Sequence, residues 1–257
     1  MDYGLKDKVA LVTGTASQTG MGHKICLTLA KEGCDIASAD LDLEGARKTA
    51  DEVKALGRKA AAFKVDVTNG DEAAAVVKAV LSQFGKIDIL VNTAGGIAIG
   101  GKPFPEQNSD LWQKDISLNL YGTMNMSKAA VPSMVERKYG KIVNFASIAA
   151  KQPQLNSYAA AKAAVISVTA GLASTYGPSN INANAIAPGV VQETNFFNAI
   201  PAERRKQMFD GMAQRVPLRR LQTTEDIANA VAFLVSDVSR NITGQCLQVD
   251  SGLVMLA

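Results

Sequence analysis

Short apolar runs rich in β-branched residues alternate with longer amphipathic stretches along most of the chain. The first run, from Val9 to Thr13, ends at Gly14, and the second, from Asp35 to Ala39, ends at Asp40. Between these two runs, apolar and small residues from Lys24 to Lys31 recur at helical spacing. Runs this short predict buried strands, and their alternation with helices predicts parallel strands joined by right-handed crossovers.

The same alternation continues to the end of the chain, with no linker or low-complexity tract. Further strands are expected from Ala60 to Val65, Ile87 to Val91, Lys141 to Phe145, Ile181 to Ala187 and Cys246 to Asp250. Further helices are expected from Leu43 to Leu56, Asp71 to Phe84, about Ser109 to Met134, Tyr158 to Tyr176 and Thr224 to Val235. The pattern therefore predicts an α/β fold, a single doubly wound domain over residues 1–257 with about seven parallel strands flanked by helices.

Composition excludes several classes of protein. The chain has 257 residues and is 47% hydrophobic, which is ordinary for a globular protein. It carries 27 basic and 24 acidic side chains, and a net charge of +3 gives no reason to expect nucleic-acid binding. No apolar run approaches the roughly 18 residues that a membrane span requires, and charges stand where a signal peptide needs its apolar stretch. Three widely spaced cysteines form neither a disulfide framework nor a metal knuckle, which predicts a cytoplasmic protein.

The histidine count narrows the chemistry further. His23 is the only histidine, so a histidine-rich zinc or iron site cannot be built from this chain, and we expect no metal. A Ser-His-Asp hydrolase would have to use His23, which lies in a glycine-rich turn. Proton transfer would then fall to Tyr, Lys, Asp, Glu, Cys or Ser.

A glycine-rich turn follows the first predicted strand. Gly14, Gly20 and Gly22 allow a tight turn in which backbone N–H groups approach a pyrophosphate, and the next helix directs its positive end at the phosphates. Asp40 ends the second strand about 20 residues after Gly20, where a carboxylate accepts hydrogen bonds from the adenosine ribose. Its charge would repel a 2′-phosphate, so it favours NAD over NADP. The alternative interpretations are that the glycines form only a tight strand-to-helix turn and that Asp40 is only a turn residue at the end of a strand.

Asp66 ends the third predicted strand in the same way. From there its carboxylate could reach the adenine edge of a dinucleotide. Locally, an equally good interpretation is that Asp66 caps the following turn together with Thr68 and Asn69.

A candidate catalytic pair follows the fifth predicted strand. Tyr158 and Lys162 are four residues apart on a helix and therefore share a face. Lowering the pKa of a phenol by about three units takes roughly 4 kcal/mol, which Lys162 and a positively charged nicotinamide ring could supply. Ser147 ends the strand and could hold a substrate oxygen, or it could only cap a loop. Asn119, within a predicted helix, could disturb the backbone and hold a water next to Lys162, or it could be a surface residue.

Together these residues resemble the short-chain dehydrogenase/reductase family of the Tyr-x-x-x-Lys type over essentially the whole chain. The matching segments also include Asp66-Val67, Asn92-Thr93-Ala94-Gly95, Pro188-Gly189, Thr243-Gly244-Gln245 and Val249-Asp250-Ser251-Gly252. The resemblance implies a Rossmann-like fold, a homotetramer, and proton transfer by Tyr158. It also implies that Lys162 binds the nicotinamide ribose and tunes Tyr158, that Ser147 positions the substrate oxygen, and that Asn119 organises a water relay.

The resemblance and the glycine turn together predict a set of cofactor contacts spread over the ends of the strands. These are Gly14, Ser17, Thr19, Gly20, Met21, Gly22, Asp40, Asp66, Val67, Asn92, Ala94, Gly95, Tyr158, Lys162, Pro188, Gly189, Val191 and Thr194. The expected cofactor is NAD, and the expected function is hydride transfer between NAD and a secondary alcohol or ketone.

The chain departs from the family pattern in its glycine turn, which is two residues longer than usual and resembles that of enoyl-thioester reductases. Those enzymes separate Tyr and Lys by six residues, and Leu155 stands where that Tyr would fall. Enoyl reduction is therefore a less favoured alternative. A second alternative is a partner subunit that keeps the fold but does not catalyse a reaction. The presence of all four residues Tyr158, Lys162, Ser147 and Asn119 argues against this alternative.

A polar stretch, residues 190–221, is expected to cover the substrate as a lid. It contains six basic residues, Arg204, Arg205, Lys206, Arg215, Arg219 and Arg220, and four large apolar residues, Phe196, Phe197, Ile200 and Met208. One hypothesis is that the lid receives a largely apolar alcohol or ketone with an anionic tail. The favoured alternative is a solvated amphipathic helix, because charge runs usually face water.

Overall fold

Seven parallel strands form one sheet in the computed structural model, which describes residues 2–255 except 99, 101, 195–196 and 198–199. Their order across the sheet is β3-β2-β1-β4-β5-β6-β7, which confirms the predicted doubly wound α/β fold. The strands are β1 (Val9–Thr13), β2 (Asp35–Asp40), β3 (Ala60–Lys64), β4 (Ile89–Asn92), β5 (Gly140–Phe145), β6 (Ile181–Pro188) and β7 (Cys246–Val249).

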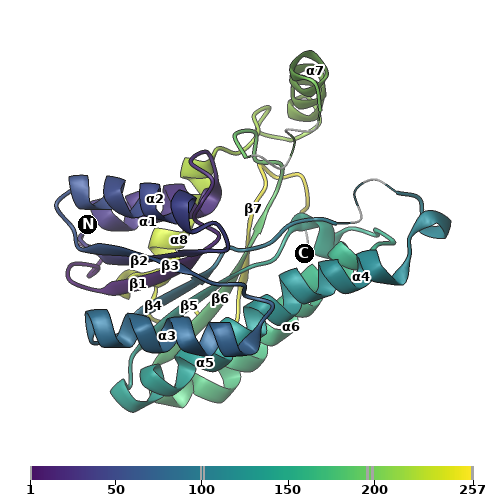
Figure 1. The fold of residues 1–257 in the computed structure, drawn as a ribbon. Helices are drawn as coiled ribbons and strands as arrows, with labels where there is room; N and C mark the ends of the chain where they lie inside the picture. Colours follow the sequence, from purple (N-terminus) through teal and green to yellow (C-terminus); the bar gives the residue numbers. More distant parts are fainter. Residues whose placement is uncertain (1, 99, 101, 195–196, 198–199, 256–257) are drawn as a thin grey trace.

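Helices cover both faces of the sheet (Figure 1). One face carries α1 (Met21–Lys31), α2 (Leu43–Ala55) and α8 (Thr224–Val235), and the other carries α3 (Gly70–Phe84), α5 (Gly122–Arg137) and α6 (Ser157–Tyr176). Strand β1 supplies both cores because successive side chains point to opposite faces: Ala10 and Val12 enter one core, and Val9 and Leu11 the other. None of the described helices is long and apolar enough to span a bilayer.

The strand order reverses between β1 and β4. Strand β1 pairs with β2 on one side and with β4 on the other, so the connections that leave β1 and β4 run to opposite faces of the sheet. This reversal opens a crevice at the carboxyl ends of the strands, where ligands bind in doubly wound folds. The glycine-rich turn after β1 and residues 93–97 after β4 border this crevice.

The long helix expected from Ser109 to Met134 is interrupted. Helix α4 (Ser109–Ile116) passes into a π-helical segment (Ser117–Tyr121) before α5 begins at Gly122. Asn119 lies in this segment, and its side-chain amide donates to the carbonyl of Asp115, four residues earlier, at 2.8 Å. The expectation that Asn119 disturbs the local backbone is therefore confirmed, because its side chain occupies a carbonyl that a regular helix would pair with a backbone N–H.

The solvated amphipathic helix favoured for residues 190–221 is present in the structure. Helix α7 (Ala202–Ala213) stands away from the sheet and its covering helices (Figure 1). Its only buried residue is Phe209, whose ring meets that of Phe197 edge-on, with 5.3 Å between the ring centres, in a small apolar cluster with Val216 and Leu221. Because only one residue of α7 is buried, its apolar positions show little helical periodicity, and the apolar pattern does not give its bounds.

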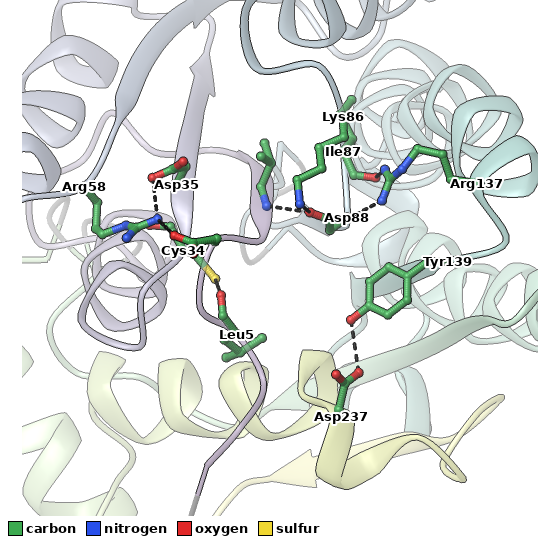
Figure 2. Close-up of polar contacts among 12 residues, drawn as sticks. Leu5, Cys34, Asp35, Arg58, Lys86, Ile87, Asp88, Arg137, Tyr139 and Asp237 are labelled. Atoms are coloured by element: carbon green, nitrogen blue, oxygen red, sulfur yellow. Dashed lines mark hydrogen bonds and ion pairs between the residues drawn. The ribbon is translucent and has the colours of Figure 1, made fainter.

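A buried carboxylate joins three elements at the opposite, amino end of the sheet. The Asp88 side chain is 2% exposed, accepts a hydrogen bond from the Val9 backbone at 2.9 Å, and pairs with Lys86 at 2.9 Å and with the guanidinium of Arg137 (Figure 2). A buried charge is tolerated when each of its lone pairs is matched in this way. Nearby, the Tyr139 hydroxyl donates to Asp237.

We expect Asp88→Ala to lower the free energy of unfolding by about 2 to 4 kcal/mol, because two cations and a backbone N–H lose their acceptor. The value lies below that of a fully buried pair because Lys86 and Arg137 partly reach water. Urea denaturation measures it, with Asp51→Ala as control because that carboxylate is 70% exposed. Equal losses in both variants would contradict the assignment.

Candidate active site

A cleft of about 1040 Å³ opens at the carboxyl ends of the strands. Its walls come from the turn after β1, the end of β2, and the loops that follow β4, β5 and β6. Residues that are far apart in the sequence, such as Gly14, Asp40, Tyr158 and Pro188, therefore line one continuous space. A cleft of this size at a switch point is large enough for a dinucleotide together with a small substrate.

The glycine turn has no room for a side chain at Gly14 or Gly22. Gly14 has φ of +71°, and a Cβ on it would lie 2.8 Å from the backbone nitrogen of Ala94. A Cβ on Gly22 would lie 2.2 Å from the carbonyl oxygen of Gly14. These contacts bring the first turn of α1 directly against the end of β1 and the loop after β4, so the turn closes tightly at the switch point.

The amino end of α1 faces this cleft without a side-chain cap. Gly20 is the N-cap residue and offers no side chain to the first N–H groups of the helix. Ser17, Gly20, Met21 and Gly22 all line the cleft, whereas Thr19 does not. Uncapped N–H groups and the helix dipole suit the negative charge of a pyrophosphate.

Two carboxylates stand at one end of the cleft. Asp40 accepts a hydrogen bond from the Ala16 backbone on Oδ2 at 2.9 Å and from the Asp42 backbone on Oδ1 at 3.1 Å. Both bonds hold the carboxylate toward the glycine turn, and each oxygen keeps a lone pair for a ribose hydroxyl. Asp42 also lines the cleft, and Lys162 is the one cationic side chain among the described residues that line it.

One buried polar atom at the wall of the cleft has no hydrogen-bond partner and indicates that the cleft fits a ligand. The Thr93 hydroxyl is buried and has no hydrogen-bond partner in the protein, and Thr93 lines the cleft. Buried polar groups are normally satisfied, so a ligand that supplies polar atoms would complete this wall. Together with the glycine turn and the uncapped helix, the residues present fit a dinucleotide.

Lys162 is buried beneath the other end of the cleft. It is 4% exposed, and its ammonium donates to the carbonyl of Phe145, at the end of β5, at 2.7 Å. Its Nζ lies 5.8 Å from the centre of the Tyr158 ring, so the two side chains share a face as predicted. Burial lowers the pKa of Lys162 to about 8, because the ammonium loses most of its hydration.

The pKa of Tyr158 does not follow the expectation. Burial raises it above its usual value, a side-chain hydrogen bond with Ser147 lowers it, and the negative charge of Asp115 raises it further. The expected lowering by Lys162 is therefore not found in the protein alone, where desolvation of the phenolate is the largest effect. Tyr158 accordingly holds its proton at neutral pH.

Ser147 and Asn119 flank this pair. Ser147 lines the cleft and also accepts the Ala149 backbone N–H at 3.2 Å, so it combines the predicted site position with the alternative capping role. Asn119 is fully buried, donates to the carbonyl of Gly96 at 2.8 Å, and accepts the N–H of Gly96 at 3.2 Å. It is therefore not a surface residue, and it anchors the loop after β4.

Asn119 and Lys162 approach the same side of Gly95. A Cβ on Gly95 would lie 2.9 Å from Asn119 Oδ1 and 3.2 Å from Lys162 Nζ. The absence of a side chain leaves space between an amide oxygen and an ammonium, where a water molecule could accept from one and donate to the other.

Other predicted contacts divide into two groups. Ala94, Gly95, Pro188, Gly189, Val191 and Thr194 line the cleft as expected, whereas Asp66, Val67 and Asn92 do not. Asp66 accepts from the backbone and the hydroxyl of Thr68, which is the alternative turn-capping arrangement. Asn92 donates to Asn144 at 2.8 Å and so links β4 to β5. Cofactor contact by these three residues stays a prediction.

Among the described residues, the predicted lid lines the cleft only through its first part, at Val190, Val191, Thr194 and Phe197. Phe197 lines it, whereas none of the six basic residues from Arg204 to Arg220 does, and Phe196 lies outside the described residues. Lys206 instead pairs with Asp210 along the exposed side of α7. Sequence reasoning also did not identify Ile97, Ile148 and Gln154 as lining residues, because isolated apolar or amide residues in loops carry no pattern.

The described residues contain no group of three or more side chains that could hold a metal ion. Tyr158, Lys162 and Ser147 line the cleft, and Asn119 lies buried next to it, bonded to Gly96. The arrangement can hold an oxygen atom between two hydroxyl groups and move a proton to or from it.

Comparison with known proteins gives matches over nearly the whole chain. A family profile described as enoyl-(acyl carrier protein) reductase matches residues 14–254. The chain is 34% identical over 250 residues to 7alpha-hydroxysteroid dehydrogenase of Escherichia coli strain K12, which covers 96% of this chain and 94% of that protein. It is also 34% identical over 253 residues to 3-oxoacyl-(acyl-carrier-protein) reductase FabG of Thermotoga maritima. That match covers 98% of this chain and 99% of the relative.

A solved structure is also closely similar. It is 7alpha-hydroxysteroid dehydrogenase complexed with NADH and 7-oxo glycochenodeoxycholic acid, with a TM-score of 0.90 and 34% identity, over 98% of this chain and 96% of that chain.

We expect Lys162→Met to gain stability relative to the wild type at neutral pH and to lose that gain as the pH rises from 8 to 10. The folded protein releases the Lys162 proton near pH 8 and the unfolded chain near pH 10.4, so the wild type becomes more stable between those values by at most about 1.4 kcal/mol per pH unit. Urea midpoints at pH 7, 8, 9 and 10 measure the difference. The exposed Lys114→Met serves as control, and a pH-independent difference would contradict the buried ammonium.

Proposed function

The chain belongs to the short-chain dehydrogenase/reductase family of oxidoreductases, and we propose that it transfers a hydride between NAD and a secondary alcohol or ketone. The observation that carries this proposal is the convergence of Tyr158, Ser147 and Lys162 at one end of a cleft whose other end carries Asp40. Two relatives, a hydroxysteroid dehydrogenase and a 3-oxoacyl reductase, support the alcohol and ketone chemistry.

Charge supports NAD as the cofactor. Asp40 and Asp42 stand together at the β2 end of the cleft, and no described cation lines that end. A 2′-phosphate would meet two carboxylates, whereas the 2′- and 3′-hydroxyls of NAD can donate to them. The structural neighbour complexed with NADH is consistent with this choice.

The reduction of a ketone consumes one hydride and one proton. The nicotinamide ring supplies the hydride when the cofactor is bound. Tyr158 donates its phenolic proton to the carbonyl oxygen as that oxygen gains electrons, and the Ser147 hydroxyl donates a hydrogen bond to the same oxygen. Because the pKa of Tyr158 is raised, the proton is available at neutral pH, and oxidation of the alcohol, which needs the phenolate, is favoured by alkaline pH.

Proton resupply is the role that we propose for the buried groups. Lys162 carries a positive charge below about pH 8, which stabilises the phenolate left after proton donation. The space beside Gly95 connects Lys162 to Asn119, and a water there would pass protons toward Tyr158. The bond from Lys162 to Phe145 keeps the ammonium aimed at this space.

The substrate end of the cleft is largely apolar. Ile97, Ile148, Val190 and Phe197 line it, with the Gln154 amide as a polar neighbour. This supports a mainly apolar alcohol or ketone, and the lid's basic residues, which do not line the cleft, give no support to an anionic tail. A homotetramer and a cytoplasmic location remain predictions from the family and the cysteine content.

Enoyl-thioester reduction is the second candidate, because the matching family profile carries that description and the long glycine turn fits it. It would need a proton donor at Leu155. That residue is leucine, is 69% exposed, and does not line the cleft, whereas Tyr158 does. The geometry therefore favours the alcohol and ketone reaction. A non-catalytic subunit would have no reason to bury Lys162 beside Tyr158.

We expect Tyr158→Phe to lower kcat by about 10² to 10⁴-fold and to leave NADH binding nearly unchanged, because only the transferred proton is removed. Reduced-nicotinamide absorbance over a panel of secondary alcohols and ketones measures the rate, and NADH fluorescence measures binding. Near-normal turnover would show that Tyr158 is not the proton donor. Absence of turnover in the wild type across the panel would contradict the proposed function itself.

Exchange of Asp40 tests the cofactor. Asp40→Asn should raise the ratio of kcat/KM with NADP to that with NAD by about tenfold or more, since one like charge beside the 2′-phosphate is removed. The variant also loses one backbone hydrogen bond, which weakens both cofactors and cancels in the ratio. Glu44→Gln, exposed at the start of α2, is the matched control. A wild-type preference for NADP would overturn the assignment.

A further inference from the structure

A buried acid lies behind the reacting groups. Asp115 is the one fully buried residue of α4 and is 1% exposed. Its carboxylate accepts two hydrogen bonds, and no cation of the described residues pairs with it. An anion without a counter-charge is costly to bury, so a residue of this kind needs a reason beyond packing.

Its three hydrogen bonds join three segments of the reaction centre. Oδ1 accepts the backbone N–H of Ala98 in the loop after β4, and Oδ2 accepts the hydroxyl of Ser157, the first residue of α6, at 2.7 Å. The Asp115 carbonyl accepts the Asn119 side chain at 2.8 Å, and Asn119 holds Gly96 in turn. Helix α4 packs directly against α6, as Figure 1 shows.

We propose that Asp115 is a positioning residue for the reaction described above, whose buried carboxylate fixes the start of α6 against the loop after β4 and places a negative charge against Ser157, the residue directly before Tyr158. This inference rests on the proposed function for its effect on rate. The hydrogen bond to Ser157 acts on the residue directly before Tyr158, so the position of the phenol depends on it.

The charges that face Tyr158 come from few elements. Lys162, on its own helix, lies on the cleft side and donates to Phe145, and Asp115 approaches from α4. Loop residues 95–98 carry no ionisable side chain. Lys151, at the end of the short helix after β5, is bound to Gln248 Oε1 at 3.2 Å.

The negative charge of Asp115 raises the pKa of Tyr158 and so opposes loss of the proton. The phenol is therefore kept as a donor, which suits the direction of ketone reduction at neutral pH. Removal of the charge should favour the phenolate and bring alcohol oxidation to lower pH.

Asp115→Asn isolates the charge. The amide oxygen can still accept from Ala98, and the amide nitrogen can donate to the Ser157 hydroxyl, so both hydrogen bonds are retained. We expect the acid limb of the pH profile for alcohol oxidation to move to lower pH by about half a pH unit to one pH unit. A profile that falls in height without moving would overturn the electrostatic part of the proposal.

Two further variants separate the hydrogen bond from the charge. Ser157→Ala removes the bond to α6 and keeps the carboxylate, so kcat should fall several-fold with no move of the acid limb to lower pH. Asp110→Asn removes an exposed acid of the same helix and should leave rate and profile unchanged. A wild-type rate in Ser157→Ala, together with an Asp115→Asn protein that does not fold, would show that the carboxylate only stabilises the fold.

A titration without turnover separates this inference from the proposed function. The phenolate absorbance that is lost in Tyr158→Phe reports the ionisation of Tyr158 in the purified protein. In Asp115→Asn this ionisation should occur at lower pH than in the wild type. An unchanged titration would refute the role of Asp115 whether or not the protein turns over alcohols, whereas a shifted titration in a protein without turnover would refute only the proposed reaction.

Discussion

The burial of the Lys162 ammonium is the constraint on which the active site depends. The cation is held by one carbonyl, that of Phe145, and has lost most of its water. Its position is set by the start of α6, by the end of β5, and by a glycine at 95 that leaves room beside it. A lysine in that state can stabilise a neighbouring anion strongly, because little solvent screens the interaction. The raised pKa of Tyr158 nevertheless means that the phenol keeps its proton at neutral pH in the protein alone.

Buried charges are paired at the amino end of the sheet and unpaired at the carboxyl end. At the amino end, Asp88 meets two cations and a backbone N–H, so the buried charge is neutralised. At the carboxyl end, Lys162 and Asp115 are both buried without an ion pair among the described residues. Paired charges hold elements together, whereas unpaired ones remain able to act on a neighbouring proton or ligand.

Several features of the fold could be predicted because they depend on neighbours in sequence. Strands such as Val9–Thr13 and helices such as α3 show their apolar period directly, and the predicted sheet is confirmed. The interruption at Asn119 also followed from one residue, since its amide competes with the backbone for hydrogen bonds. The solvated amphipathic helix favoured for residues 190–221 is present as α7, but its bounds could not be predicted because its single buried residue, Phe209, gives no period. Asp115 was not identified either, since its burial comes from α6 and the loop after β4, which are distant in sequence.

By itself the sequence determined the element order, the glycine turn and the Tyr158–Lys162 spacing, because strand period, helix period and turn chemistry are local properties. The three-dimensional arrangement established which groups share the cleft, that Asp66 and Asn92 are not among its lining residues, and that the pKa of Tyr158 lies above its usual value. Those outcomes depend on desolvation and on charges brought together from different elements. Burial is a property of everything that surrounds a group, and no short stretch of sequence contains it.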